Sequence, residues 1–195
     1  MKNIFLILVA IIYSSGLLYL ALPDPKIAPL PQSLRSDEPG DTWQHPEQSA
    51  YYTDLNRQQI TDFYQKSFSL KLGSVTLPSY RLNYPPEETG VYVREQLLSY
   101  YLEEIIHPLR ESLFVSGWNP RLSPISNYRF DLEKARWEII VNNKEYQGKI
   151  TLKPYFSPLW IRFFIWTSIF PLTYLVLSQF TNSTRKLFLT LKSKS

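Results

Sequence analysis

Two long apolar runs, one near each end of the chain, dominate the pattern of hydrophobic and polar positions. The stretch Phe163–Phe180 contains no charged residue. At ~1.5 Å rise per residue it is about long enough to cross a hydrocarbon layer of ~30 Å. The other run follows Lys2 and ends near Leu22. Because a backbone in lipid must satisfy its own hydrogen bonds, the pattern predicts transmembrane helices over residues 1–22 and 158–181.

The N-terminal run also resembles the opening of a signal peptide, with one Lys ahead of apolar residues. A signal peptide has a shorter apolar core of ~7–15 residues and a small-residue cleavage site. The junction Leu20–Pro23 is a poor match to such a site. We therefore expect an uncleaved helix or signal anchor; cleavage would leave the C-terminal helix as the one anchor.

The positions of the basic residues predict the orientation of the two helices. Lys2 precedes the first helix, and Arg185 and Lys186 open a basic tail over residues 182–195. Since Lys and Arg favour cytoplasmic flanks, both termini are predicted to be cytoplasmic and the middle of the chain extracytoplasmic. A bacterial cell membrane suits such a chain.

Four residues are predicted to anchor the second helix at the two membrane surfaces. Trp160 and Arg162 precede the uncharged stretch, where an indole ring and a snorkelling guanidinium group suit the headgroup region. Arg185 and Lys186 serve the opposite surface, where they can contact anionic lipid. The lipid bilayer is thus the first predicted partner.

The middle of the chain divides into a Pro-rich segment and a folded domain. Residues 23–48 carry repeated prolines among Asp, Ser and Gly, which predicts a stiff linker. Residues 49–157 have mixed periodicity and are predicted to form an extracytoplasmic domain. Its first elements are a strand at 50–53 and a helix ending near Phe68, capped by Asp54 or Asn56.

Strand patterns follow over residues 70–82, with a turn at Gly73-Ser74. Two prolines and two acids at residues 85–88 then favour a helix start, and an apolar stripe continues the predicted helix to about Gly117. Strands are predicted at Tyr128–Leu132 and Arg136–Val141, with a hairpin at Asn142-Asn143. The expected fold is α+β: a mostly antiparallel sheet with two helices on one face, flanked by the transmembrane helices.

Charge and composition narrow the functional classes. The net charge of +4 and pI near 9.1 would suit a nucleic-acid binder, but every acidic residue lies between Asp24 and Glu145. The excess of basic residues belongs to the apolar ends, so it indicates membrane topology, and no nucleic-acid partner is expected. The chain has no cysteine, which excludes disulfides, cysteine zinc sites and a thiol nucleophile.

The best candidate for chemistry lies in the predicted long helix. Glu103, His107 and Glu111 recur every four residues there, and Glu104 precedes His107 by three. A Glu-x-x-His pair on a helix can bind a metal, but helix-bundle sites add carboxylates from other helices. The zinc-protease pattern needs a second histidine. A solvated helix face is therefore the preferred interpretation of Glu103, Glu104 and His107, and neither a metal nor a cofactor is expected.

These observations favour a non-enzymatic, membrane-anchored protein that binds or assembles with an envelope or membrane protein. A homo-oligomer is an alternative partner arrangement. The alternative function is an envelope enzyme or metal-dependent protein that uses Glu103, Glu104 and His107. Aromatic residues make up 15% of the chain; they suit core and interface packing, or a carbohydrate or peptide cleft.

Overall fold

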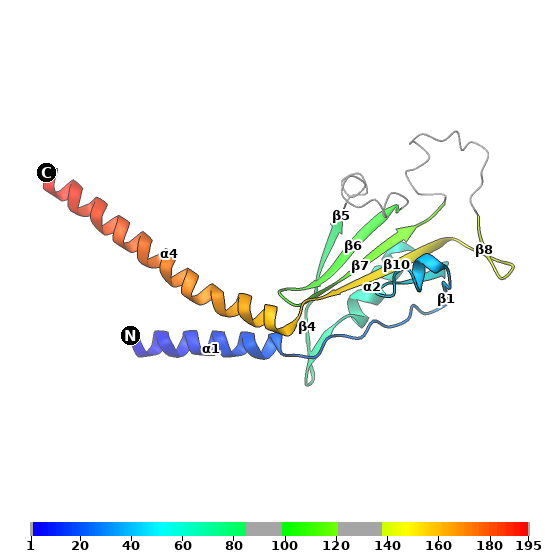
Figure 1. Cartoon of the computed structure of the whole chain (residues 1–195), viewed down its shortest axis with the longest axis horizontal. Helices are drawn as coiled ribbons and strands as arrows, with labels where there is room; N and C mark the ends of the chain where they lie inside the picture. The colour runs from blue at the N-terminus through cyan, green and yellow to red at the C-terminus, as the bar shows by residue number, and fades with distance from the viewer. Residues whose placement is uncertain (1, 85–98, 121–137, 195) are drawn as a thin grey trace. The chain divides into compact units, whose positions relative to one another are not determined.

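The computed structural model describes residues 2–84, 99–120 and 138–194 (Figure 1). The chain forms two compact units. One contains residues Met1–Leu22 and Ser157–Ser195, and the other contains Pro23–Phe156.

The second unit is built on an antiparallel six-stranded sheet with the order β1-β2-β10-β7-β6-β5. Its strands are β1 (Ser33–Arg35), β2 (Ser49–Thr53), β5 (Tyr80–Tyr84), β6 (Tyr101–His107), β7 (Glu111–Trp118) and β10 (Gly148–Phe156). Two small hairpins pair β3 (Leu70–Leu72) with β4 (Val75–Leu77) and β8 (Ile139–Val141) with β9 (Lys144–Tyr146). With helix α2 (Arg57–Ser67) and the 3-10 turn η1 (Pro39–Asp41), this confirms the predicted α+β class.

Helix α2 begins where its sequence predicts. The Asn56 side chain accepts a hydrogen bond from the backbone N–H of Gln59, whose side chain in turn accepts from the backbone N–H of Asn56. This capping box satisfies two N–H groups that have no partner within the helix. Ile60 and Tyr64 on α2, and Phe68 just after it, are buried in the core.

The sheet has two different faces. Successive strand residues point to opposite sides, so the pairing of Ile150 with Gly117 and of Leu152 with Val115 puts all four on one side. This first face packs with α2 and carries the main core, to which Tyr51, Tyr101, Ile105 and Leu113 also belong. The residues that alternate with these along β7 and β10, including Phe114 and Thr151, lie on the second face.

The predicted long helix is wrong over residues 101–118. These residues form β6 and β7, joined by a turn in which the backbone N–H of Arg110 donates to the carbonyl of His107 at 3.1 Å. Pro108 is the second residue of the turn and Leu109 the third, with φ 64°. A proline followed by a positive φ is typical of a type II turn. Among the described residues, the domain therefore has one α-helix, α2.

The earlier part of that predicted helix, over residues 85–98, lies outside the described residues, as does the strand predicted at Tyr128–Leu132. The hairpin predicted at Asn142-Asn143 is confirmed: both residues have positive φ, 53° and 60°, as a two-residue turn between β8 and β9 requires.

Part of the Pro-rich segment is built into the domain. Residues Ser33–Arg35 form β1 at one edge of the sheet, paired with β2. Leu30 is 4% exposed within the main core, and Ser36 is also buried. Apolar contacts and a strand ladder thus hold this part, and it is not a free spacer.

The other unit consists of α1 (Lys2–Leu20) and α4 (Leu159–Lys194). Both contain a window long and apolar enough to cross a membrane, Asn3–Leu20 and Leu159–Arg185. Helix α4 runs through Pro171 and continues beyond the predicted end at residue 181.

The two helices pack together with opposite chain directions. A Cβ atom at Gly16 would lie 2.2 Å from the Trp166 ring, so glycine permits the close approach. Tyr13 comes earlier in α1, and its hydroxyl forms a hydrogen bond of 3.2 Å with the hydroxyl of Thr167. The Tyr13 ring also packs against Phe170, later in α4, with the ring centroids 5.1 Å apart. Moving back along α1 thus corresponds to moving forward along α4.

Candidate functional site

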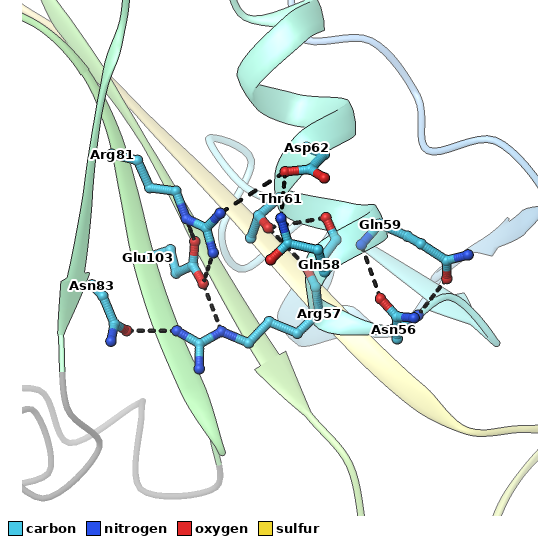
Figure 2. Close-up of polar contacts among 9 residues, drawn as sticks. All are labelled: Asn56, Arg57, Gln58, Gln59, Thr61, Asp62, Arg81, Asn83 and Glu103. Atoms are coloured by element: carbon cyan, nitrogen blue, oxygen red, sulfur yellow. Dashed lines mark hydrogen bonds and ion pairs between the residues drawn. The ribbon is translucent and has the colours of Figure 1, made fainter.

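Glu103 lies on the first face of the sheet and is fully buried between two arginines (Figure 2). Arg57 comes from the first turn of α2, and its Nε donates to Glu103 Oε1 at 2.6 Å. Arg81 comes from β5; its terminal nitrogen donates to the same oxygen at 2.7 Å, and its Nε pairs with Oε2. These contacts connect α2, β5 and β6.

Neighbouring groups complete this ion-pair cluster. The Arg57 guanidinium also donates to Asn83 Oδ1 at 2.7 Å and lies over the Tyr101 ring at 5.2 Å. Asp62 is 4.0 Å from Arg81. The buried carboxylate is thus paired by charge and hydrogen bonding, as a stable fold requires. We assign the cluster the structural role of tying α2 to the sheet.

The other two sequence candidates lie elsewhere. Glu104 is on the second face, where its carboxylate accepts a hydrogen bond from the Tyr84 hydroxyl at 2.6 Å. That bond, with burial as a smaller cause, raises the pKa of Tyr84 to about 12. His107 is on the first face, four residues from Glu103, which is roughly 13 Å along a strand.

His107 forms a second buried polar cluster near the β6–β7 turn. Its Nδ1 lies 3.1 Å from Glu111 Oε1, and Phe68 stacks on its ring with centroids 5.3 Å apart. Arg110 Nε lies 3.0 Å from the other oxygen of Glu111. Arg110 also reaches Asp24 at 3.5 Å and the carbonyl of Pro23 at 3.2 Å, which holds the start of the domain against the turn.

The prediction that Glu103, Glu104 and His107 lie on one helix is therefore wrong. Glu103 and Glu104 point to opposite faces, and each of the three candidates belongs to a different cluster. Within residues 2–84, 99–120 and 138–194, no group of three or more His, Asp and Glu side chains is placed to hold a metal ion.

The second face of the sheet carries a cavity of about 540 Å³, a size common among small-molecule and peptide sites. Strands β2, β7 and β10 provide its floor, and β8 and the segment around Glu38 add to its lining. Its lining includes Phe114, Trp118 and Ile139, together with the hydroxyls of Ser116 and Thr151 and the ammonium groups of Lys149 and Lys153. Aromatic rings and convergent polar groups make it the best candidate functional site.

One wall of the cavity is a closed polar network around Lys149. The Lys149 ammonium lies 2.6 Å from Asp41 and 2.8 Å from Glu38, and the Tyr52 hydroxyl donates to Glu38. Ser36 donates to Asp41. The positive charge of Lys149 is therefore compensated by two carboxylates of the domain itself, the nearly buried Asp41 and the exposed Glu38.

The pKa values in this network follow from those contacts. The hydrogen bond from Lys149, followed by that from Tyr52, lowers the pKa of Glu38. Burial lowers the pKa of Lys149, but its hydrogen bonds to Asp41 and Glu38 outweigh burial and leave it raised. Burial and the bond to Glu38 raise the pKa of Tyr52. The ionised Lys149 and Glu38 and the neutral Tyr52 are thus the favoured forms at neutral pH.

Sequence reasoning missed most of the cavity. Strand order brings β2, β7 and β10 together, and no local pattern contains that order. Among the many aromatic residues, Tyr51, Tyr64 and Tyr101 belong to the core, whereas Tyr52 lines the cavity. The alternation around Lys149, Thr151 and Lys153 is the one local sign that these three side chains share a face.

The four predicted membrane anchors are all on α4. Trp160 is 70% exposed and Arg185 is exposed. Arg162 is 3% exposed, and its Nε donates to the carbonyl of Ser157 at 2.7 Å. Arg162 thus supports the chain's entry into α4. Its contact with lipid headgroups stays a prediction. The side chain of Lys186 lies outside the described residues.

Comparisons with protein-family models, with curated proteins and with solved structures give no match to this chain.

Proposed function

We propose that this protein is a membrane-anchored binding or assembly protein without catalytic activity. Helices α1 and α4 span a bacterial cell membrane with both termini in the cytoplasm. The domain over residues 23–156 works on the extracytoplasmic side, where its cavity binds an envelope or membrane protein. The observation that carries the proposal is the cavity on the second face, in a domain connected at both ends to apolar helices.

The contacts of α1 and α4 support the membrane part. Two helices of opposite direction return the chain to the side from which it started. The hydroxyls of Ser168, Ser178, Thr181 and Thr184 donate to carbonyls of their own helix. Such bonds suit a helix in lipid, where every polar group needs an internal partner.

The separation of the acidic candidates supports binding over catalysis. Glu103 forms ion pairs with two arginines, and Glu104 accepts a hydrogen bond from a tyrosine on the opposite side of the sheet. A general acid and base, or a set of metal ligands, would have to share one pocket. The cavity combines aromatic, aliphatic and hydroxyl groups with the charged residues Glu38, Glu138, Lys149 and Lys153, of which Glu38 is paired with Lys149. Such a mixed lining suits recognition.

The topology can be tested cleanly because the natural chain has no cysteine. Single-cysteine variants Asn3→Cys, Asp37→Cys and Ser193→Cys are treated with a membrane-impermeant maleimide in intact cells and after lysis. We expect labelling of Asp37→Cys alone in intact cells and of all three after lysis. Labelling of either terminal cysteine in intact cells would contradict the proposed orientation.

Binding is tested by photo-crosslinking in cells. Ile140 lines the cavity and is 60% exposed; Val75 is 57% exposed but lies on β4, which contributes nothing to that cavity. A photoreactive phenylalanine derivative is placed at each position in turn. A discrete cross-linked product from position 140 and none from position 75 is expected; equal products, or none from either, would refute the proposed binding site.

A further inference from the structure

The two lysines of the cavity differ in how far their charge is compensated. Lys149 lies within 2.8 Å of two carboxylates. Lys153 Nζ lies 4.0 Å from a carboxylate oxygen of Glu47, which is beyond hydrogen-bond distance, and the Glu47 side chain is 47% exposed. The Lys153 ammonium also lies 5.7 Å from the Tyr155 ring centroid. An ammonium has three N–H donors, so Lys153 retains the capacity to bind an anion.

The surroundings of Lys153 favour a carboxylate attached to an apolar group. The register pairs Lys153 with Phe114 and Thr151 with Ser116, so an ammonium, a ring and two hydroxyls are adjacent on the second face. Trp118 and Ile139 line the same cavity. A free inorganic anion would pair with the Lys153 ammonium but would leave the apolar lining of the cavity exposed to water.

The backbone of the cavity wall favours a polypeptide. Strand β8 lines the cavity, and in the part of the chain that the structure describes its one ladder partner is β9. The other edge of β8 can pair with an added strand, because an extended peptide satisfies such an edge with main-chain hydrogen bonds. A glycan or a lipid headgroup lacks the alternating N–H and C=O groups for that pairing.

We propose that the cavity receives an extended segment of the partner protein, with an Asp or Glu side chain bound by Lys153 and a neighbouring apolar side chain packed against Phe114 and Trp118. This inference rests on the proposed function, since it names the chemistry of the partner at the same cavity. The ion pairs of Lys149 stabilise the cavity wall, and Lys153 binds the negatively charged side chain of the partner.

The test uses the full-length protein in cells with the photoreactive residue at position 140. It is combined with Lys153→Glu, and with Lys71→Glu as the control, because Lys71 is an exposed lysine on β3. Lys153→Glu reverses the charge beside the bound carboxylate and should reduce the cross-linked product by about tenfold or more. Lys71→Glu should leave it unchanged. Mass spectrometry then identifies the cross-linked segment.

The inference is supported if the segment contains an acidic residue within about three positions of the cross-link, a reach of roughly 10 Å in an extended chain. Replacing that acid with Lys should restore cross-linking to the Lys153→Glu variant. An unchanged product from Lys153→Glu, or a captured segment, glycan or lipid without a nearby carboxylate, would refute the inference and leave cavity binding intact. No product specific to position 140 in the parent protein would refute both.

Discussion

Replacing Glu103 with Gln should destabilise the domain by removing the charge from a fully buried group while keeping its shape. The carboxylate is 0% exposed and contacts both Arg57 and Arg81. A net contribution of about 1.5–3 kcal/mol is typical of one hydrogen bond to a charged group, and breaking a buried ion pair costs about 3–5 kcal/mol. The two arginine side chains are 37% and 26% exposed, so water can solvate part of the charge left behind. We therefore expect a cost near the lower limit, about 3 kcal/mol.

Urea unfolding of the full-length protein in detergent measures this cost, with near-ultraviolet circular dichroism as the probe. For a domain of this size, 3 kcal/mol corresponds to a decrease in Tm of roughly 10 °C. Asp37→Asn is the matched control, because it removes one negative charge from an exposed position and should change stability by less than about 0.5 kcal/mol. The slope of the unfolding curve should stay constant, since the same surface is exposed.

A double-mutant cycle then isolates the ion pair. Arg81→Gln is measured alone and together with Glu103→Gln, and we expect a coupling energy of about 1–2 kcal/mol between the two changes. If Glu103→Gln is as stable as Asp37→Asn, the carboxylate is not held between two guanidinium groups. If the two changes are additive, the pair does not connect β5 with β6 energetically.

The remaining predictions concern close packing and pH. Gly117→Ala should destabilise the domain by about 2–3 kcal/mol, because its Cβ would lie 1.9 Å from a ring carbon of buried Tyr101; Gly40→Ala, with its nearest atom at 3.9 Å, is the control, and equal Tm values for the two variants would be inconsistent with this packing. The pKa of Tyr84 is raised to about 12, so its contribution to stability is present below about pH 10 and lost as pH rises toward 12. Ultraviolet titration of tyrosinate should show that step moving toward pH 10 in Glu104→Gln and disappearing in Tyr84→Phe; an unchanged step in Glu104→Gln would rule out the hydrogen bond.

Local patterns were sufficient where one segment makes its own structure. The apolar run without charges predicts α4, and the capping residue Asn56 predicts the start of α2. The Asn142-Asn143 pair predicts the tight turn between β8 and β9. In each case the determining contacts lie within a few residues, either as intrahelical bonds or as a turn that tolerates positive φ.

The long-helix prediction failed because β6 is buried on both faces. Residues 101–105 are all buried, so the strand shows a continuous run in place of alternation, and such a run also fits a helical stripe. Pro108 begins a turn that Leu109 completes. A proline at this turn position is the local sequence signal that distinguishes the β6–β7 hairpin from a helix.

The sequence by itself determined two apolar helices, an α+β domain between them and the local elements with strong caps or turns. The tertiary structure decided the partners of the charged residues. Glu103, Glu104 and His107 are close in sequence, yet the alternation of β6 separates Glu103 from Glu104 and strand length separates Glu103 from His107. Lys149 and Lys153 became neighbours of Tyr52 and Phe114 through the strand order β2-β10-β7. Strand order and register depend on contacts between distant segments, so the cavity emerges only when the whole sheet has formed.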